Sequence, residues 1–351
     1  MSLHFSNIKS LPGFDNQKLI VWVHDEKVGL DGFISIHRGN LKYPAFGATR
    51  IWDYKNSKEA LIDALRLSKT MSYKAAVAGL KCGGAKAAII FPRVIDGNRK
   101  KVLKAYSQRV NYLGGHFITG ADVGVTREDV KFMRRQSPYF VGTKVDPVRF
   151  TGLGLLYSIE ICFKEVFGTK SLKGRTFAIQ GVGKVGQELL KLIYKEAGGI
   201  YVYDVNKDQT VEAKKKFPKI NVVGVNELLG LKVDVFSPNA LSDCLTDTSI
   251  NKIKSQIIVG GANCQLQNDS IAHKLHRMGI LYAPDYVVNA GGLISVFDEY
   301  EHGNSRVRRV LKRIEIVKKN IELILSKSRK TNKPPVEVAN RMAEKVFNTM
   351  S

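Results

Sequence analysis

Two lysines stand in a stretch of sequence that otherwise has the composition of a protein core. Lys74 and Lys86 lie twelve residues apart in "MSYKAAVAGLKCGGAKAAII", residues 71–90, where alanine, glycine and aliphatic residues dominate. Lysine is rarely fully buried unless its charge is paired or used. The two side chains either extend their tips to water or serve a chemical purpose. In the second case, burial and a neighbouring ammonium group would both lower a lysine pKa toward the range of about 7–8 that suits a base.

The local pattern predicts how these lysines are presented. Residues 57–79 are typical of a helix, with Ser57 as the expected N-cap and Glu59 in the first turn, where the helix dipole favours an anion. Lys74 falls on the apolar stripe of this helix, and the stripe consists of Ala60, Ala64, Leu67, Met71, Lys74 and Ala78. A glycine-rich turn then brings Lys86 to the start of an expected strand, residues 86–91.

A second group of residues has the spacing of a dinucleotide-binding turn. An expected strand, 175–180, is followed by "GVGKVG" at the start of an expected helix, 184–198, and Asp204 ends the next strand, 199–204. In such a turn the glycines permit a tight bend and close approach of a pyrophosphate, the helix N-terminus attracts the phosphates, and the acid binds ribose hydroxyls. The alternative is that the glycines only shape a strand–helix corner. The cofactor-binding residues predicted here are Gly181, Val182, Gly183, Lys184, Val185, Gly186 and Asp204, and the cofactor is NAD because Asp204 would repel a 2′-phosphate.

The second half of the chain alternates strands and helices. Further strands are expected at 233–238, 256–263 and 280–286, which predicts a doubly wound parallel sheet. The fold class is therefore α/β with two domains and an active-site cleft between them. We expect an N-terminal α/β domain at 1–145 for substrate binding and oligomerisation, with a C-terminal helix, 330–351, packing back on it, and a Rossmann-type NAD-binding domain at 146–329.

Composition narrows the class of protein. The chain has 351 residues, of which 44% are hydrophobic and 25% charged, as in a globular protein of two ordinary domains. We find no secretory signal, no membrane span and no paired cysteines that would suggest a metal site, so we expect a cytoplasmic protein. The net charge of +23 raises the possibility of nucleic-acid binding. The lysines are spread along the chain without a nucleic-acid motif, which favours a solvated basic surface.

Seven motifs in order resemble one enzyme family. They are "GATR" (47–50), "YK" (73–74), "GGAK" (83–86), "ADVG" (121–124), "QGVGKVG" (180–186), "GANCQL" (261–266) and "APDYVVNAGG" (283–292). From about residue 20 to the C-terminus, the chain resembles the glutamate/leucine/phenylalanine/valine dehydrogenases, and the leucine dehydrogenase branch most closely.

The resemblance implies a role for each lysine. Lys74 would bind the α-carboxylate of the substrate, and Lys86 would be the general base that activates water for attack on an imine. Asp122 would be its partner in proton transfer. Asn263 and Thr151 are implied as contacts of NAD and Asn289 as a contact of substrate. The two asparagines equally suit strand ends, where an amide bonds to backbone, and Thr151 equally suits a helix cap.

The resemblance also bears on the substrate. Gly47 and Ala48 are implied as substrate contacts. Glutamate dehydrogenases hold the side-chain carboxylate with a lysine and a serine, at positions that match Phe46 and Val296. With Leu293 and Gly120 these residues describe an apolar pocket, in which Gly120 leaves room for a larger side chain. A second carboxylate buried there would cost several kcal/mol.

Two departures from the family pattern are Ala48 and Ala85, which replace glycines. Each is expected to add a methyl group near the substrate. The expected activity is NAD-dependent oxidative deamination of an apolar L-amino acid, of the leucine and branched-chain type, and the reverse reaction, by a homo-oligomer. The alternatives are a dehydrogenase of phenylalanine or tryptophan, and a weakly active basic binding protein.

Overall fold

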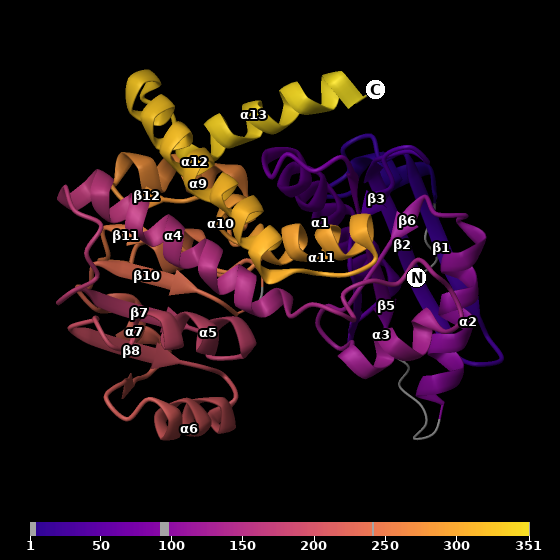
Figure 1. The fold of residues 1–351 in the computed structure, drawn as a ribbon, viewed down its shortest axis with the longest axis horizontal. Coiled ribbons are helices and arrows are strands. Elements are labelled where there is room, and N and C mark those ends of the chain that lie inside the picture. The colour runs from indigo at the N-terminus through magenta and orange to yellow at the C-terminus, as the bar shows by residue number, and fades with distance from the viewer. Residues whose placement is uncertain (1–4, 92–97, 241, 351) are drawn as a thin grey trace. The chain divides into compact units, whose positions relative to one another are not determined.

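The computed structural model describes residues 5–91, 98–240 and 242–350 (Figure 1). Its contacts divide the chain into two compact units. Unit 1 comprises Met1–Val145, Val296–Ser305 and Ala343–Ser351, and unit 2 comprises Asp146–Ser295 and Arg306–Met342. Two segments differ from the expected division. Residues 296–305 group with unit 1, and the first half of the last helix groups with unit 2.

Unit 1 is built on a mixed six-stranded sheet. Its strands are β1 (Leu19–Asp25), β2 (Leu30–Arg38), β3 (Ala45–Phe46), β4 (Thr49–Trp52), β5 (Gly83–Ile90) and β6 (Phe117–Ile118). The order is β1-β2-β5-β3-β6, with β4 beside β5. β1, β2 and β5 pair antiparallel, whereas β3, β4 and β5 run parallel. The other elements are a 3-10 helix (Phe5–Ser10) and helices α1 (Ser57–Val77), α2 (Arg99–Tyr112) and α3 (Arg127–Arg134).

Helix α1 covers one face of this sheet. Its N-cap is Asn56, whose side chain accepts a hydrogen bond from the backbone N–H of Glu59, rather than the expected Ser57. The helix approaches β5 so closely that a Cβ on Gly84 would lie 2.0 Å from the backbone nitrogen of Ser72. Gly84 thus allows helix and strand to meet backbone to backbone, whereas a Cβ on Gly83 would lie 1.8 Å from the carbonyl oxygen of Arg38 on β2.

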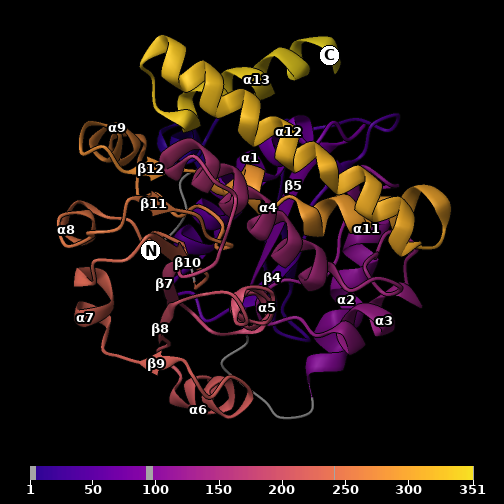
Figure 2. The same ribbon diagram turned by 60° about the vertical axis from the view of Figure 1, so that its left-hand side comes forward.

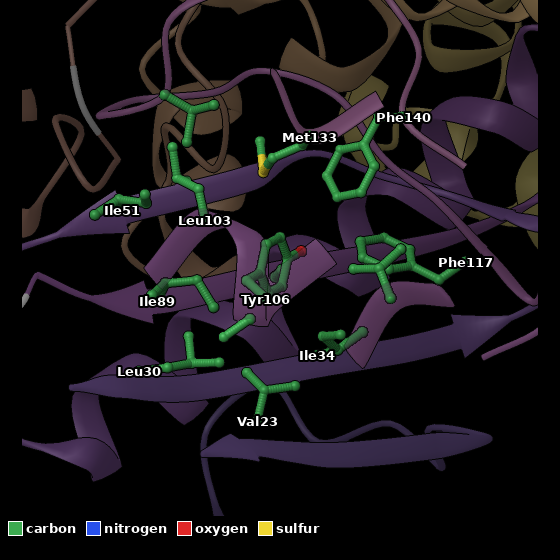
Figure 3. Close-up of a cluster of buried hydrophobic side chains, with 14 of the residues drawn as sticks. Val23, Leu30, Ile34, Ile51, Ile89, Leu103, Tyr106, Phe117, Met133 and Phe140 are labelled. Atoms are coloured by element: carbon green, nitrogen blue, oxygen red, sulfur yellow. The ribbon is translucent and has the colours of Figure 1, made fainter. Parts of the chain in front are cut away.

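The opposite face of the sheet carries the main core of unit 1. Tyr106 and Leu103 of α2 and Met133 of α3 pack there on the strands (Figure 3). Ala85 belongs to this core, and Lys86, the next residue along β5, must therefore face α1. The expectation that Ala85 adds a methyl group near the substrate was wrong, because its side chain points into the core on the opposite face from Lys86.

A buried histidine lies where β2 meets α1. The side chain of His37 has no exposed surface, and its Nε2 lies 3.1 Å from a carboxylate oxygen of Asp15. Asp15 also pairs with Lys69 of α1, at 3.3 Å. Burial, reinforced by the neighbouring Arg38 charge, lowers the pKa of His37 to about 4, although Asp15 opposes the shift. His37 is therefore neutral at physiological pH.

Unit 2 holds the doubly wound sheet that the sequence predicts. Its strands are β7 (Thr176–Gln180), β8 (Gly199–Tyr203), β9 (Asn221–Val222), β10 (Val235–Pro238), β11 (Ile257–Ile258) and β12 (Leu281–Tyr282). All paired strands run parallel, in the order β12-β11-β10-β7-β8-β9. Figure 2 shows β7, β8 and β9 in succession toward α6. Read from the other edge, this is the 3-2-1-4-5-6 order of the Rossmann fold, which reverses direction between β7 and β10.

The helices of unit 2 and two connecting helices complete the chain. Unit 2 contains α4 (Pro147–Phe167), α5 (Lys184–Ile193), α6 (Lys207–Lys216), α7 (Val225–Gly230), α8 (Asp247–Ile250), α9 (Asp269–Arg277), α10 (Asp285–Val288) and α12 (Val307–Thr331). Helices α11 (Gly291–His302) and α13 (Pro335–Met350) each contribute residues to both units. The strands expected at 256–263 and 280–286 are shorter than predicted, since each retains two residues and α10 follows β12. Within the described residues, no helix is sufficiently long and apolar to span a bilayer.

Candidate active site

A cluster of buried charges surrounds Lys86 in unit 1. The Lys86 ammonium donates to Oδ2 of Asp122, which lies in the loop after β6. Arg50, on β4, donates from Nε to the same oxygen at 3.1 Å. Only 4% of the Lys86 side chain and 10% of the Arg50 side chain are exposed. Two cations thus share one carboxylate oxygen in a nearly dry environment.

This arrangement shifts both partners of the Lys86–Asp122 pair. Burial lowers the pKa of Lys86 below its ordinary value, and Asp122 opposes that shift while Arg50 adds to it. Burial alone would raise the pKa of Asp122, but the charges of Lys86 and Arg50 outweigh it and hold that pKa well below the usual range. The site therefore combines an ionised carboxylate with a lysine that loses its proton more readily than a free one.

The cluster extends to residues that the sequence reading did not include in the site. Oδ2 of Asp63, on α1, accepts hydrogen bonds from Nη1 of Arg50 at 2.9 Å and from the Tyr54 hydroxyl at 2.6 Å. Asp63 precedes Lys74 by eleven residues, about three helical turns, so both lie on one side of α1. That spacing and the arginine of "GATR" were the available signals for this extension.

Lys74 also lies in the interior of unit 1. It is on α1 and only 6% exposed, so its side chain does not reach water as the snorkelling alternative required. The role predicted for it, binding of the substrate α-carboxylate, stays a prediction.

The residues of unit 1 that are expected to line the substrate pocket are mostly apolar. Phe46 is 1% exposed and packs edge-on against Phe297 and Tyr300 of α11, with ring centroids 5.1 and 4.9 Å away. Val296, one turn earlier on α11, is half-buried, and Gly47 and Ala48 are also partly exposed. A Cβ on Gly47 would lie 2.0 Å from the carbonyl oxygen of Ala85, so glycine is required there by close strand packing.

Gly120 does not provide the expected space. A Cβ at this position would lie 2.9 Å from the carbonyl oxygen of Val141. The prediction that Gly120 leaves room for a larger substrate side chain was therefore wrong for the space that a Cβ on residue 120 would occupy, because Val141 fills it. The glycine instead allows the Val141 backbone to pack closely against the end of β6.

Glu299 of α11 holds the loop that follows Val141. Its carboxylate is 3% exposed and accepts hydrogen bonds from the backbone N–H groups of Gly142, Thr143 and Lys144, at 3.1, 3.1 and 2.9 Å. One buried anion thus fixes three consecutive backbone donors. This contact could not be predicted from the sequence, because its partners are more than 150 positions apart.

In unit 2 the glycine turn has the geometry that a pyrophosphate requires. Gly181 has φ +92°, a left-handed conformation that favours glycine. A Cβ on Gly186 would lie 2.1 Å from the carbonyl oxygen of Gly181, so helix α5 packs tightly on the turn. A Cβ on Gly183, the N-cap of α5, would meet no described atom within 4 Å. The middle glycine therefore faces open space at a helix N-terminus, and the turn fits NAD.

Asp204 lies beside this turn at the end of β8. Its Oδ2 accepts the backbone N–H of Val182 at 2.8 Å, and its Oδ1 accepts that of Asn206 at 2.9 Å. Each carboxylate oxygen has a second lone pair, so these bonds fix the orientation of Asp204 while leaving acceptor capacity. The predicted contact with ribose hydroxyls is compatible with this geometry.

The remaining predicted residues of unit 2 are Asn263 in the loop after β11, Asn289 at the C-terminal end of α10, Thr151 on α4 and Leu293 on α11. The Asn289 amide donates to the carbonyl oxygens of Gly261 and Ala262 and to Oδ1 of Asn263, and its own Oδ1 has no partner among the described residues. The Thr151 hydroxyl donates to the carbonyl of Pro147 at 2.9 Å within α4. Asp146 is the N-cap of α4, so the helix-cap alternative for Thr151 was wrong. Leu293 is half-buried on α11.

Comparison with known proteins identifies the family. Residues 142–351 match the family described as "Glutamate/Leucine/Phenylalanine/Valine dehydrogenase", and residues 18–139 match "Glu/Leu/Phe/Val dehydrogenase, dimerisation domain". The chain belongs to the Glu/Leu/Phe/Val dehydrogenase family. It is an amino-acid dehydrogenase, and its cofactor is NAD.

Individual relatives differ in the amino acid that they are named for. The chain is 37% identical to the leucine dehydrogenase of Geobacillus stearothermophilus, over 94% of this chain and 90% of that one. It is 36% identical to the phenylalanine dehydrogenase of Lysinibacillus sphaericus, over 95% and 89%. The crystal structure of L-tryptophan dehydrogenase from Nostoc punctiforme is 34% identical over 95% and 96% of the two chains, with a TM-score of 0.77.

Proposed function

We propose that the protein oxidises an apolar L-amino acid, leucine or another branched-chain residue, to the 2-oxo acid and ammonia, and catalyses the reverse reductive amination. The observation that carries the proposal is the dry Lys86–Asp122–Arg50 cluster. It contains a lysine with a lowered pKa beside an ionised carboxylate, which is what a general base and its proton-transfer partner need.

Each residue has a task in this reaction. Lys74 pairs with the substrate α-carboxylate. When bound, NAD supplies the acceptor for the hydride of the substrate Cα, which leaves an imine. Lys86 takes a proton from the water that attacks the imine carbon, and Asp122 exchanges protons with the amino group. The resulting carbinolamine releases ammonia and becomes the 2-oxo acid.

The surroundings of Phe46 support the proposal of an aliphatic substrate. Two aromatic rings pack against it, and Phe46 and Val296 stand where a side-chain carboxylate would need polar partners. An acidic side chain there would lose its hydration without compensation. The proposal of leucine rather than phenylalanine or tryptophan rests on the similarity of the chain to leucine dehydrogenases.

We also propose that the protein works as a homo-oligomer in the cytoplasm. The match of residues 18–139 to a dimerisation domain supports the first point. The second is supported by four free cysteines, of which Cys82 and Cys162 are buried thiols that suit a reducing compartment.

The test compares kcat/KM for L-leucine, L-valine, L-phenylalanine, L-tryptophan and L-glutamate with NAD. We expect leucine or valine to be best, the aromatic residues to be weaker and glutamate to be inert. An aromatic substrate preferred over leucine would establish the aromatic alternative. A preference for glutamate would refute the assignment of the pocket.

A further inference from the structure

The shared oxygen of Asp122 gives Arg50 a position that its place in a sequence motif does not explain. Arg50 and Lys86 both donate to Oδ2, the arginine at 3.1 Å. When Lys86 loses its proton, Asp122 loses the attraction of that charge and stays paired with a cation only if a second one contacts it. A guanidinium in contact with the same oxygen supplies that cation, and it remains protonated throughout.

Arg50 is itself held in place from its other side. Nη1 donates to Oδ2 of Asp63 at 2.9 Å, and the Tyr54 hydroxyl donates to the same oxygen at 2.6 Å. The side chains of Asp63 and Asp122 are 19% and 17% exposed, respectively. The guanidinium is thus fixed between two carboxylates, one on helix α1 and one in the loop after β6, and cannot turn away from Asp122 without breaking a charged hydrogen bond.

We propose that Arg50, oriented by Asp63, is a positioning residue that keeps Asp122 paired while Lys86 gives up its proton. The inference rests on the proposed function, since it assigns a task to two residues in the same reaction. Neither Arg50 nor Asp63 needs to contact the substrate. Both act through the Lys86–Asp122 pair.

The charge count predicts opposite effects for the two residues. With Lys86 protonated, the four groups Lys86, Asp122, Arg50 and Asp63 sum to zero, and with Lys86 neutral they sum to minus one. Removing the Arg50 charge makes both states more negative and binds the proton of Lys86 more tightly. Removing the Asp63 charge does the reverse. The pKa of Lys86, lowered chiefly by burial, is shifted further down by Arg50 and upward by Asp63, in keeping with this count.

The experiment measures kcat/KM against pH for L-leucine oxidation by the wild type, Arg50→Gln and Asp63→Asn. Asp53→Asn is the matched control, because Asp53 is an exposed carboxylate three residues from Arg50. We expect the midpoint of the acidic limb to rise by about one pH unit in Arg50→Gln and to fall by about half a unit in Asp63→Asn, because Arg50 acts on Lys86 more strongly than Asp63 does. Asp53→Asn should leave it unchanged. The ionisation of leucine is common to all four proteins and cancels.

The outcomes separate positioning from a purely structural role. A structural role would lower activity at every pH, or lower the unfolding midpoint, with the pH midpoint unmoved. Unmoved midpoints in an active enzyme, or movement of both variants in one direction, would overturn the proposal. If Arg50→Gln does not fold, as judged by circular dichroism, the test rests on the other two variants. The proposal then requires a lower pH midpoint in Asp63→Asn and an unchanged one in Asp53→Asn. A wild type that oxidises no L-amino acid would instead refute the proposed function, and this inference with it.

Discussion

Replacement of Lys86 by methionine should separate catalysis from stability. The substitution keeps an unbranched side chain, one heavy atom shorter, and removes its charge. Loss of a general base usually costs about 100-fold or more in rate, so kcat for leucine should fall by at least that factor. NAD binding should be unaffected, because the residues that fit NAD are in unit 2, on the turn between β7 and α5.

The cost in stability should be modest for a buried ion pair. Removing one partner of such a pair typically costs about 3–5 kcal/mol, because the other charge is left uncompensated. Here Arg50 still donates to the same oxygen of Asp122, at 3.1 Å. We therefore expect the free energy of unfolding to fall by only about 1.5–3 kcal/mol, the loss of one charged hydrogen bond. Urea denaturation measures the free energy of unfolding, NADH absorbance measures kcat, and calorimetric titration measures NAD binding.

Two results would refute the reasoning. Turnover near that of the wild type would exclude Lys86 as the base. If Lys86→Met lowers the free energy of unfolding by more than about 3 kcal/mol, Arg50 does not compensate the charge of Asp122, even where kcat falls by the expected factor.

Three further predictions test other parts of the structure. Gly183→Ala should weaken NAD binding about tenfold or more without changing stability, because its methyl group enters open space at the cofactor turn. Gly120→Ala should lower the free energy of unfolding by about 1–3 kcal/mol, because its methyl group presses on the Val141 carbonyl. Urea denaturation and NAD titration of both variants measure these effects. Asp204→Ala should narrow the preference for NAD over NADP, measured as the ratio of kcat/KM, and an unchanged ratio would mean that Asp204 does not read the ribose. His37, with its pKa lowered to about 4, stays neutral in the native state while the unfolded chain takes up a proton below about pH 6.5. Stability should thus fall by about 2 kcal/mol from pH 7 to pH 5, and His37→Gln should show a smaller fall in urea denaturation at the two pH values.

The parts of the fold that could be predicted from the sequence are those set by local pattern. Strand–helix alternation and the glycine turn predict the parallel sheet of unit 2, because each signal lies within about thirty residues. Lys74 on the apolar stripe of α1 follows from helical periodicity. The N-cap predicted for α1 was one residue too late. Asn56 and Ser57 are both good caps, and only the backbone conformation decides between them.

The parts that could not be predicted depend on residues far apart in the chain. Arg50 meets Asp122 across 72 positions, and Glu299 meets the loop at 142–144 across about 155. Neither contact leaves a periodic signal. Ala85 and Gly120 were assigned wrongly because both depend on contacts between distant segments. The pairing of β5 with its neighbours decides which face Ala85 points to, and the packing of the Val141 backbone decides the space beside Gly120.

The central claim is that Lys86 and its neighbours carry out oxidative deamination of an apolar amino acid with NAD. The most direct measurement follows NADH absorbance and released ammonia together, for wild type and Lys86→Met, with L-leucine as substrate. We expect NADH and ammonia in equal amounts from the wild type and at least about a 100-fold slower release of both from the variant. Absence of NADH from the wild type with every apolar L-amino acid, or equal rates in the two proteins, would contradict it.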